Sequence, residues 1–158
     1  MNFVGYFENI CKTLKLTKDE FFFGRVTGLN YLEDMLRNMR SEKAFFLVED
    51  VDDGVTTTTG SGYFDRKAIV IYILKSYAVN DQVEREEKLN ECRQVRKKVQ
   101  SRLIRDVQKI PELAYLNRKR MPYHELPGYF ASGVCGFYMT IALDEPLDLR
   151  YNPDDWTD

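Results

Sequence analysis

The sequence has few of the side chains from which chemical sites are most often built. Its 158 residues include one histidine, three cysteines and one tryptophan. The single histidine, His124, has no second histidine or cysteine pair with which to bind zinc, and the sequence surroundings typical of a nucleophilic serine or cysteine are absent. We therefore expect no metal, no cofactor and no catalytic residue, and we expect that the protein is not an enzyme.

Long apolar runs and paired cysteines are also missing. No stretch reaches the roughly 18 apolar residues of a membrane-spanning helix, and the N-terminus lacks the basic start of a signal peptide. Cys11, Cys92 and Cys135 lie far apart among apolar residues, which is typical of reduced core cysteines in a cytosolic protein. We expect neither secretion nor contact with a membrane.

Charge of one sign is not in excess. Lys and Arg number 23, Asp and Glu number 25, and the formal net charge is -2. A dedicated nucleic-acid-binding protein is usually basic overall, so any contact with nucleic acid must be local. With 44% hydrophobic residues, the chain is long enough for a single domain, residues 1–158, that buries its own core.

A strand followed by a long helix dominates what the sequence does contain. Residues 68–74 are apolar on both alternating faces and rich in β-branched side chains, which predicts a central strand covered on two sides. Asp81 and Glu84 have the spacing of a capping box, and they begin a helix that runs to Lys109, about 42 Å at about 1.5 Å per residue. Its apolar stripe recurs every three or four residues at Cys92, Val95, Val99, Leu103 and Val107.

Charge is divided along this helix, with a mainly acidic first half and a basic second half. The cations of the second half are Arg93, Arg96, Lys97, Lys98, Arg102 and Arg105. This order suits the helix dipole and is typical of a solvated helix face. The sharper hypothesis is a basic surface that faces nucleic acid or an acidic partner, with Arg96, Lys97, Arg102 and Arg105 as its candidate residues.

Shorter elements are predicted before the central strand. Apolar spacing indicates a helix from the N-terminus to about Leu16, or alternatively an arm that folds on a neighbouring subunit. Residues 21–26 look like a short strand or a packed aromatic segment, and Asn30 is expected to cap a short helix that ends near Met39. Residues 43–49 predict a second strand that is apolar on both faces.

The regions between and after these elements are predicted to be less regular. The threonine-rich, glycine-flanked segment 56–62 is expected to be a mobile hairpin loop, and residues 112–128 an irregular connector. Residues 134–143 alternate cleanly, so this strand should have one face toward the core and the other less covered. Residues 144–158 predict an extended tail whose Trp156 docks on this subunit or the next one.

This order of elements predicts an α+β fold: an antiparallel or mixed sheet with a β-hairpin, packed against one long helix and shorter N-terminal helices. Residues 1–40 form a helical and aromatic segment that is a candidate arm. Two strands apolar on both faces leave more surface of the buried type than one small domain needs, so we expect a homo-oligomer. The candidate interface residues are Phe45, Leu47, Ile69, Ile71, Ile73 and Trp156.

Several segments resemble a known class of proteins. They are the paired strand and hairpin around 45–74, Leu89-Asn90-Glu91-Cys92, Arg102-Leu103-Ile104-Arg105-Asp106, the strand containing Gly136, and Asn152-Pro153-Asp154-Asp155-Trp156. In this order they resemble small structural proteins of Bacteroides-type phages and prophages, namely tail-terminator and neck-connector proteins. The resemblance covers residues 40–158 as an ordering of elements.

The resemblance implies a sheet with a long helix, and closed six- or twelve-fold rings that join the phage head to the tail or cap the tail tube. It implies other neck and tail proteins as partners, and a place in the virion after assembly in the host bacterial cytoplasm. If the basic half of the helix lines the lumen, its candidate residues would contact passing DNA. The alternative is a cytosolic binding module that uses this helix face and residues 117–120 to contact nucleic acid or an acidic partner.

Overall fold

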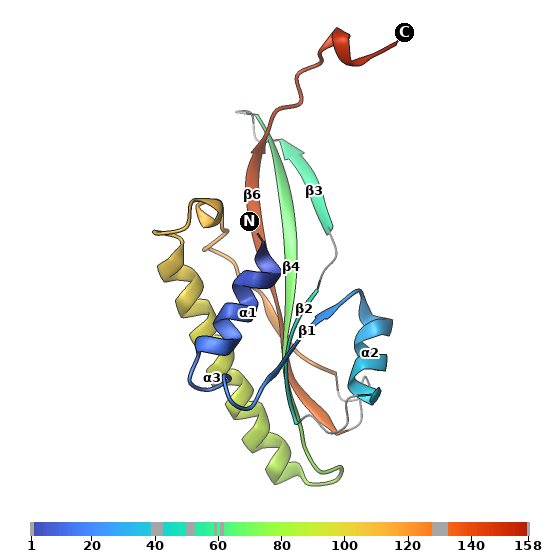
Figure 1. Ribbon diagram of the computed structural model, residues 1–158, viewed down its shortest axis with the longest axis vertical. Coiled ribbons are helices and arrows are strands. Elements are labelled where there is room, and N and C mark those ends of the chain that lie inside the picture. The colour runs from blue at the N-terminus through green and yellow to red at the C-terminus, as the bar shows by residue number, and fades with distance from the viewer. Residues whose placement is uncertain are drawn as a thin grey trace.

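A computed structural model describes residues 2–38, 43–49, 53–58, 60, 62–127 and 133–157. Within these residues the chain has an α+β fold, in which a six-stranded mixed sheet is packed against helices (Figure 1). The elements are α1 (Phe3–Thr13), β1 (Phe22–Val26), α2 (Leu29–Asn38), β2 (Ala44–Glu49), β3 (Asp53–Thr58), β4 (Tyr63–Ser76), α3 (Gln82–Asp106), the 3-10 turn η1 (Pro111–Leu113), β5 (Tyr123–Glu125), β6 (Val134–Leu147) and the 3-10 turn η2 (Pro153–Asp155).

Strand β4 is the centre of the sheet, as its two-sided apolar sequence predicts. The strand order is β1-β2-β4-β6-β5, and β1 and β2 are the parallel pair. One edge of β4 pairs with β6 along its whole length, from Tyr63 to Ser76. The other edge pairs with β2 near its C-terminal end and with β3 near its N-terminal end. Strands β2 and β3 therefore follow one another along the same side of β4.

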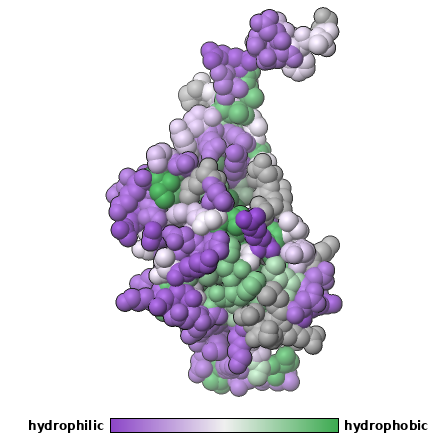
Figure 2. Space-filling view, viewed as in Figure 1, coloured by the Kyte–Doolittle hydropathy of each residue, from purple (hydrophilic) through white to green (hydrophobic). Residues whose placement is uncertain are grey.

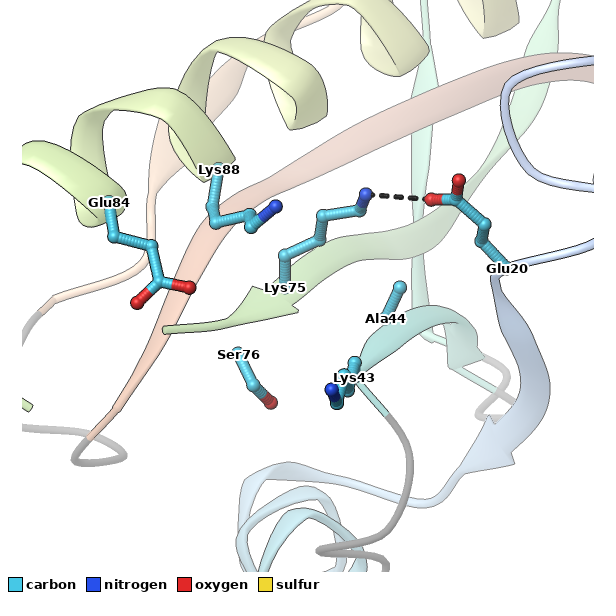
Figure 3. A pocket seen from close by; sticks show the side chains of 7 residues that line it. All are labelled: Glu20, Lys43, Ala44, Lys75, Ser76, Glu84 and Lys88. Atoms are coloured by element: carbon cyan, nitrogen blue, oxygen red, sulfur yellow. Dashed lines mark hydrogen bonds and ion pairs between the residues drawn. The ribbon is translucent and has the colours of Figure 1, made fainter. Parts of the chain in front are cut away.

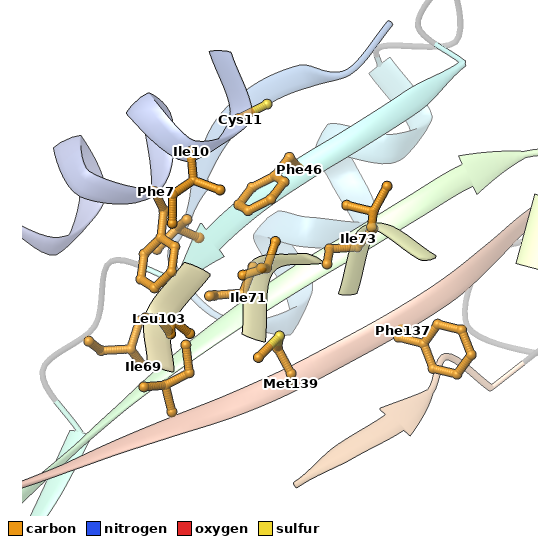
Figure 4. Close-up of a cluster of buried hydrophobic side chains, with 14 of the residues drawn as sticks. Phe7, Ile10, Cys11, Phe46, Ile69, Ile71, Ile73, Leu103, Phe137 and Met139 are labelled. Atoms are coloured by element: carbon orange, nitrogen blue, oxygen red, sulfur yellow. The ribbon is translucent and has the colours of Figure 1, made fainter. Parts of the chain in front are cut away.

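Helices α1 and α3 cover one face of the sheet, which we call the α1/α3 face (Figure 1). Its buried sheet residues alternate along β2, β4 and β6, and include Phe46, Ile71 and Met139. Phe7 of α1 and Leu103 of α3 pack over them, and both are almost fully buried (Figure 4). The apolar stripe of α3 points into this core, which confirms the stripe predicted from its spacing.

The opposite face is covered by α2 over only part of its area. Leu32 and Leu36 of α2 lie in one buried cluster with Phe45 and Leu47 of β2. Along β6, residues on the α1/α3 face are buried whereas their neighbours, such as Tyr138, are only partly buried. The cleaner alternation of the last strand therefore predicted its one-sided burial correctly, although the strand continues to Leu147 rather than ending at 143.

The start of α3 follows the predicted capping box with one difference. The side chain of Asp81 accepts a hydrogen bond from the Glu84 N–H at 2.9 Å, which satisfies a free donor of the first turn. Glu84 accepts in return from the backbone N–H of Ala78 at 2.8 Å, three residues before the cap. The regular helix ends at Asp106 and a turn continues the chain to Pro111, so the helix is slightly shorter than predicted.

Three expectations for the first half of the chain are corrected. Asn30 lies inside α2 rather than capping it, since the helix begins at Leu29. The N-terminal helix is part of the core rather than an arm, because Phe7 and Ile10 are buried against the sheet. Residues 56–58 are paired in β3 instead of forming a loop, and β4 begins at Tyr63. Threonine is β-branched and suits a strand, which explains why this polar segment pairs.

The sheet extends beyond its helices as a three-stranded ribbon made of residues 53–58, 63–68 and 142–147 (Figure 1). Opposite charges pair across it: Arg66 bonds Asp144 with two hydrogen bonds of 2.5 and 2.9 Å, and Lys67 lies 3.5 Å from Glu145. The chain leaves the end of this ribbon as a tail, residues 148–157, that projects away from the body (Figure 2).

Candidate interaction surfaces

The basic half of α3 divides into outward and inward cations. Lys97 and Arg105 are exposed, as predicted for a surface that meets a partner. Arg102 is partly exposed at 40% of its side chain, but its Nε donates to Asp106 Oδ2 at 2.5 Å. Arg96 is buried, with 6% exposure. Its assignment to a nucleic-acid-facing surface is therefore corrected.

Arg96 fastens β5 to α3. Its guanidinium carbon lies 3.6 Å from the centroid of the Tyr123 ring, a close cation–π contact, and Nη1 donates to Gln100 at 2.8 Å. Its Nε is buried and has no hydrogen-bond partner among the described residues. Burial lowers the pKa of Arg96, because the charged form loses hydration. The cation–π contact with Tyr123 and the hydrogen bond to Gln100 offset part of this loss.

Asp106 joins the end of α3 to α1. The residue is 3% exposed, and its carboxylate accepts a hydrogen bond from the Tyr6 hydroxyl at 3.0 Å as well as the one from Arg102. Burial and this hydrogen bond raise the pKa of Tyr6, and the hydrogen bond to Asp106 raises the pKa of Arg102. Both groups keep their protons at neutral pH, so the network is structural. Arg102 is consequently committed in part to its own fold.

The apolar residues proposed for a subunit interface lie in the core of the chain itself. Phe45, Leu47, Ile69, Ile71 and Ile73 are 0–9% exposed. The reason is that the two faces of β2 and β4 are covered by helices of the same chain, α1 and α3 on one side and α2 on the other. Their assignment to an interface is corrected. Of the six candidates, Trp156 alone lies at the surface, with 59% exposure.

The tail presents apolar side chains to solvent. Leu149, Tyr151 and Trp156 are 52%, 68% and 59% exposed. The Tyr151 and Trp156 rings stack at 5.9 Å between centroids, on either side of the 3-10 turn η2. Asn152 caps this turn by accepting from the Asp154 N–H at 3.2 Å. The end of the chain is therefore a small aromatic and acidic unit with a local shape of its own.

A groove between the end of α1 and the basic half of α3 was not predicted from the sequence. It has a volume of about 400 Å³ and is lined by Ile10, Thr13, Leu14, Lys15, Leu16, Lys98 and Arg102. Its lining combines apolar side chains with three cations. Leu16 lies beyond the end of α1 and is 45% exposed, and its apolar side chain next to Lys15 is a sequence signal for this surface. We call it the α1/α3 groove.

A polar pocket of about 440 Å³ lies where β4 ends beneath α3 (Figure 3). The side chain of Lys75 is 9% exposed, and its ammonium pairs with Glu20 at 2.9 Å and with Glu91. Burial disfavours the charged ammonium, but hydrogen bonds to Glu91 and Glu20 outweigh it and raise the pKa of Lys75. Lys75 is thus a protonated, fully paired cation that ties α3 to the sheet, and it lacks the free amine of a nucleophile.

The three cysteines and the single histidine are packed against other residues of the chain. Cys11, Cys92 and Cys135 are free and buried, and burial raises the pKa of the Cys11 and Cys135 thiols to about 11. His124, in β5, is exposed and stacks on Tyr138 at 5.2 Å. Among the residues that the structure describes, no group of three or more His, Cys, Asp or Glu side chains is placed to hold a metal ion. In the same part of the chain, no helix has both the length and the apolar character to cross a membrane.

No protein-family model matches the chain, and no curated protein sequence matches it.

Proposed function

We propose that the chain is a structural virion protein that forms a ring in the neck or tail of a phage, as a head–tail connector or a tail terminator. The observation that carries this proposal is the tail, which leaves the body with three large apolar side chains more than half exposed. Exposed in water, these apolar side chains contribute little hydrophobic stabilisation, whereas burial against a surface on another chain would stabilise them.

The ribbon supports the same proposal. It extends beyond the helices, and Val55 and Tyr63 are 53% and 49% exposed on it. A closed ring joins two different surfaces of each subunit, so a subunit needs a projecting element on one side and a receiving surface on the other. The ribbon with its tail is such a projecting element. The resemblance to tail-terminator and neck-connector proteins adds the phage context.

DNA contact is a further part of this proposal, now with a smaller set of residues. Lys97 and Arg105 are the candidates that are exposed, and Arg102 contributes in part. In a ring whose lumen is lined by the basic half of α3, these side chains would neutralise phosphates of passing DNA. Neutral substitutions at Lys97 and Arg105 should then lower DNA retention in assembled particles, and unchanged retention would contradict the lumen assignment.

Mass in solution tests the ring. The purified chain would be measured by light scattering behind a sizing column, over a range of protein and salt concentrations, and by electron microscopy of negatively stained particles. We expect a hexamer, a dodecamer or a concentration-dependent rise toward one, with closed rings in the images. A chain that remains an 18.6 kDa monomer at the highest concentration would contradict self-assembly into a ring.

A second candidate function is a binding module for nucleic acid or an acidic partner, and the exposed row of Lys97, Lys98 and Arg105 favours it. This function predicts binding of duplex DNA by the monomer, with an affinity that falls steeply as salt rises. Fluorescence anisotropy of a labelled duplex, with and without Lys97→Glu, would measure it. Binding that is insensitive to salt or to this substitution would exclude the basic row as the contact.

A further inference from the structure

The tail and the α1/α3 groove are complementary in charge and in polarity. Every charged side chain that lines the groove is a cation: Lys15, Lys98 and Arg102. The end of the tail carries Asp154 and Asp155 directly before Trp156. The groove has an apolar floor that includes Ile10 and Leu14, and the tail has an exposed indole.

The end of the tail has a defined local structure within the single chain. The 3-10 turn and its Asn152 cap hold the Tyr151 and Trp156 rings together, and they leave both aspartates exposed. An element with a preformed shape loses less conformational entropy when it binds than a disordered one. Large aromatic side chains are also the residues that most often anchor protein interfaces.

We propose that the tail of one copy docks in the α1/α3 groove of a second copy. Trp156 occupies the apolar floor between Leu14 and Leu16, and the two aspartates face Lys15 and Lys98. This inference rests on the proposed function, because it names the two surfaces that join neighbouring subunits. The tail and the groove are different surfaces of one chain, so the contact is head-to-tail and repeats from copy to copy until a ring closes.

A second copy is the occupant that these observations favour. The tail leaves the far end of the ribbon and points away from the body that carries the groove (Figure 1). Each copy supplies one tail and one groove, so the two surfaces are matched in number within any ring. Their opposite charges also favour this pairing and disfavour the contact of a tail with another tail.

The single tryptophan gives a direct measurement, since Trp156 is the only one in the chain. Its fluorescence emission would be recorded for the full-length protein over a range of concentrations, in parallel with the mass measurement. We expect a shift to shorter wavelength as the concentration rises, because docking moves the indole from water to an apolar site. High salt should reverse the shift in part, as it screens the charge pairs.

Two full-length variants with the same charge change separate the groove from the rest of the helix. Lys98→Glu reverses a cation that lines the groove, whereas Lys97→Glu reverses its exposed neighbour outside it. We expect Lys98→Glu to raise the protein concentration at the midpoint of the shift by roughly tenfold. We expect Lys97→Glu to leave this midpoint nearly unchanged. Trp156→Ala, read by mass alone, should weaken assembly by about thirtyfold or more.

A mixing experiment tests the head-to-tail order. Trp156→Ala keeps an intact groove, and the double variant Lys15→Glu/Lys98→Glu keeps an intact tail. Mixed in equal amounts, they should form pairs and nothing larger. Only the double variant carries a tryptophan, so a shift of emission on mixing reports its tail in the other chain's groove.

The outcomes distinguish this inference from the proposed function. Rings that assemble while the emission stays that of an exposed indole would overturn the docking and leave the ring standing. Equal effects of Lys97→Glu and Lys98→Glu would also overturn it. A shifted emission that is independent of concentration would show the tail in the groove of its own chain, which overturns docking between copies. Pairs that dock but never close into rings would retain the docking and contradict the ring.

Discussion

Replacing Gly136 with alanine should be among the most destabilising single changes in the chain. Gly136 lies in β6 with φ of +146°, opposite Leu74 of the central strand. A Cβ on its backbone would lie 2.1 Å from the carbonyl oxygen of Ile73 and 2.8 Å from the Cα of Leu74. Both are backbone atoms, so no side-chain rotation relieves the contact, and β4 and β6 must separate locally.

The magnitude follows from two costs. Overpacking of a close-packed interior typically costs about 1 to 3 kcal/mol, and holding a non-glycine residue in a sparsely populated backbone region costs about 1 to 3 kcal/mol more. We therefore expect Gly136→Ala to lower the free energy of unfolding by about 2 to 6 kcal/mol. This is a large part of the roughly 5 to 15 kcal/mol that stabilises a typical domain.

Urea unfolding followed by far-UV circular dichroism would measure this loss, with every variant at one protein concentration because assembly adds to apparent stability. Gly28→Ala is the matched control. Gly28 also has positive φ, +83°, but its Cβ would meet nothing within 4 Å. We expect the control to lose about 1 to 2 kcal/mol from backbone strain alone. If Gly136→Ala loses no more than Gly28→Ala, the pairing of β4 with β6 at this position is wrong.

Two further predictions test the packing of α3. Leu103→Ala should lower the free energy of unfolding by about 2 to 5 kcal/mol, because Leu103 is fully buried. Its neighbour Ile104 is 47% exposed, so Ile104→Ala should change this free energy by less than about 0.5 kcal/mol. Equal losses in urea unfolding would contradict the orientation of the helix. Although burial alone would raise the pKa of Glu91, hydrogen bonds from Lys75 hold it below its ordinary value of 4.5. This pair therefore stabilises the fold fully above pH 4.5 and loses its effect as pH falls through the lowered pKa. Glu91→Gln should flatten the acid side of a stability–pH curve measured by thermal unfolding. A curve that keeps the wild-type slope would refute the pairing.

The parts of the fold that the sequence predicts well are those specified by local periodicity. The two-sided apolar run at 68–74 and the apolar stripe of the long helix each require a definite environment, so β4 and α3 are predictable. Asp81 is predictable as a cap because its hydrogen bond joins residues only three apart. Segment 56–58 is not predictable as a strand, because its pairing with β4 depends on the partner rather than on its own polar sequence.

The sequence does not state which chain covers an apolar strand face. The faces of Phe45 and Ile71 point in opposite directions, and each is covered by a helix from a different part of the same chain. A neighbouring subunit would leave the same pattern in the sequence, so the sequence cannot distinguish an interface from the core of the chain itself. The burial of Arg96, in contrast, is predictable from the helical spacing of α3. At about 100° per residue, Arg96 lies between Leu103 and Leu89 on the buried arc of α3.

The inward and outward cations of α3 also explain how a chain with a net charge of -2 can present a basic surface. Arg85 and Arg96 are held by Glu125 and Tyr123 of the same chain, and Arg102 is held in part by Asp106, so these three cations connect elements of the fold. Lys97 and Lys98 face outward on α3, and Asp154 and Asp155 are exposed in the tail. The proposed docking of the tail in the groove of a second copy would bring these opposite charges together.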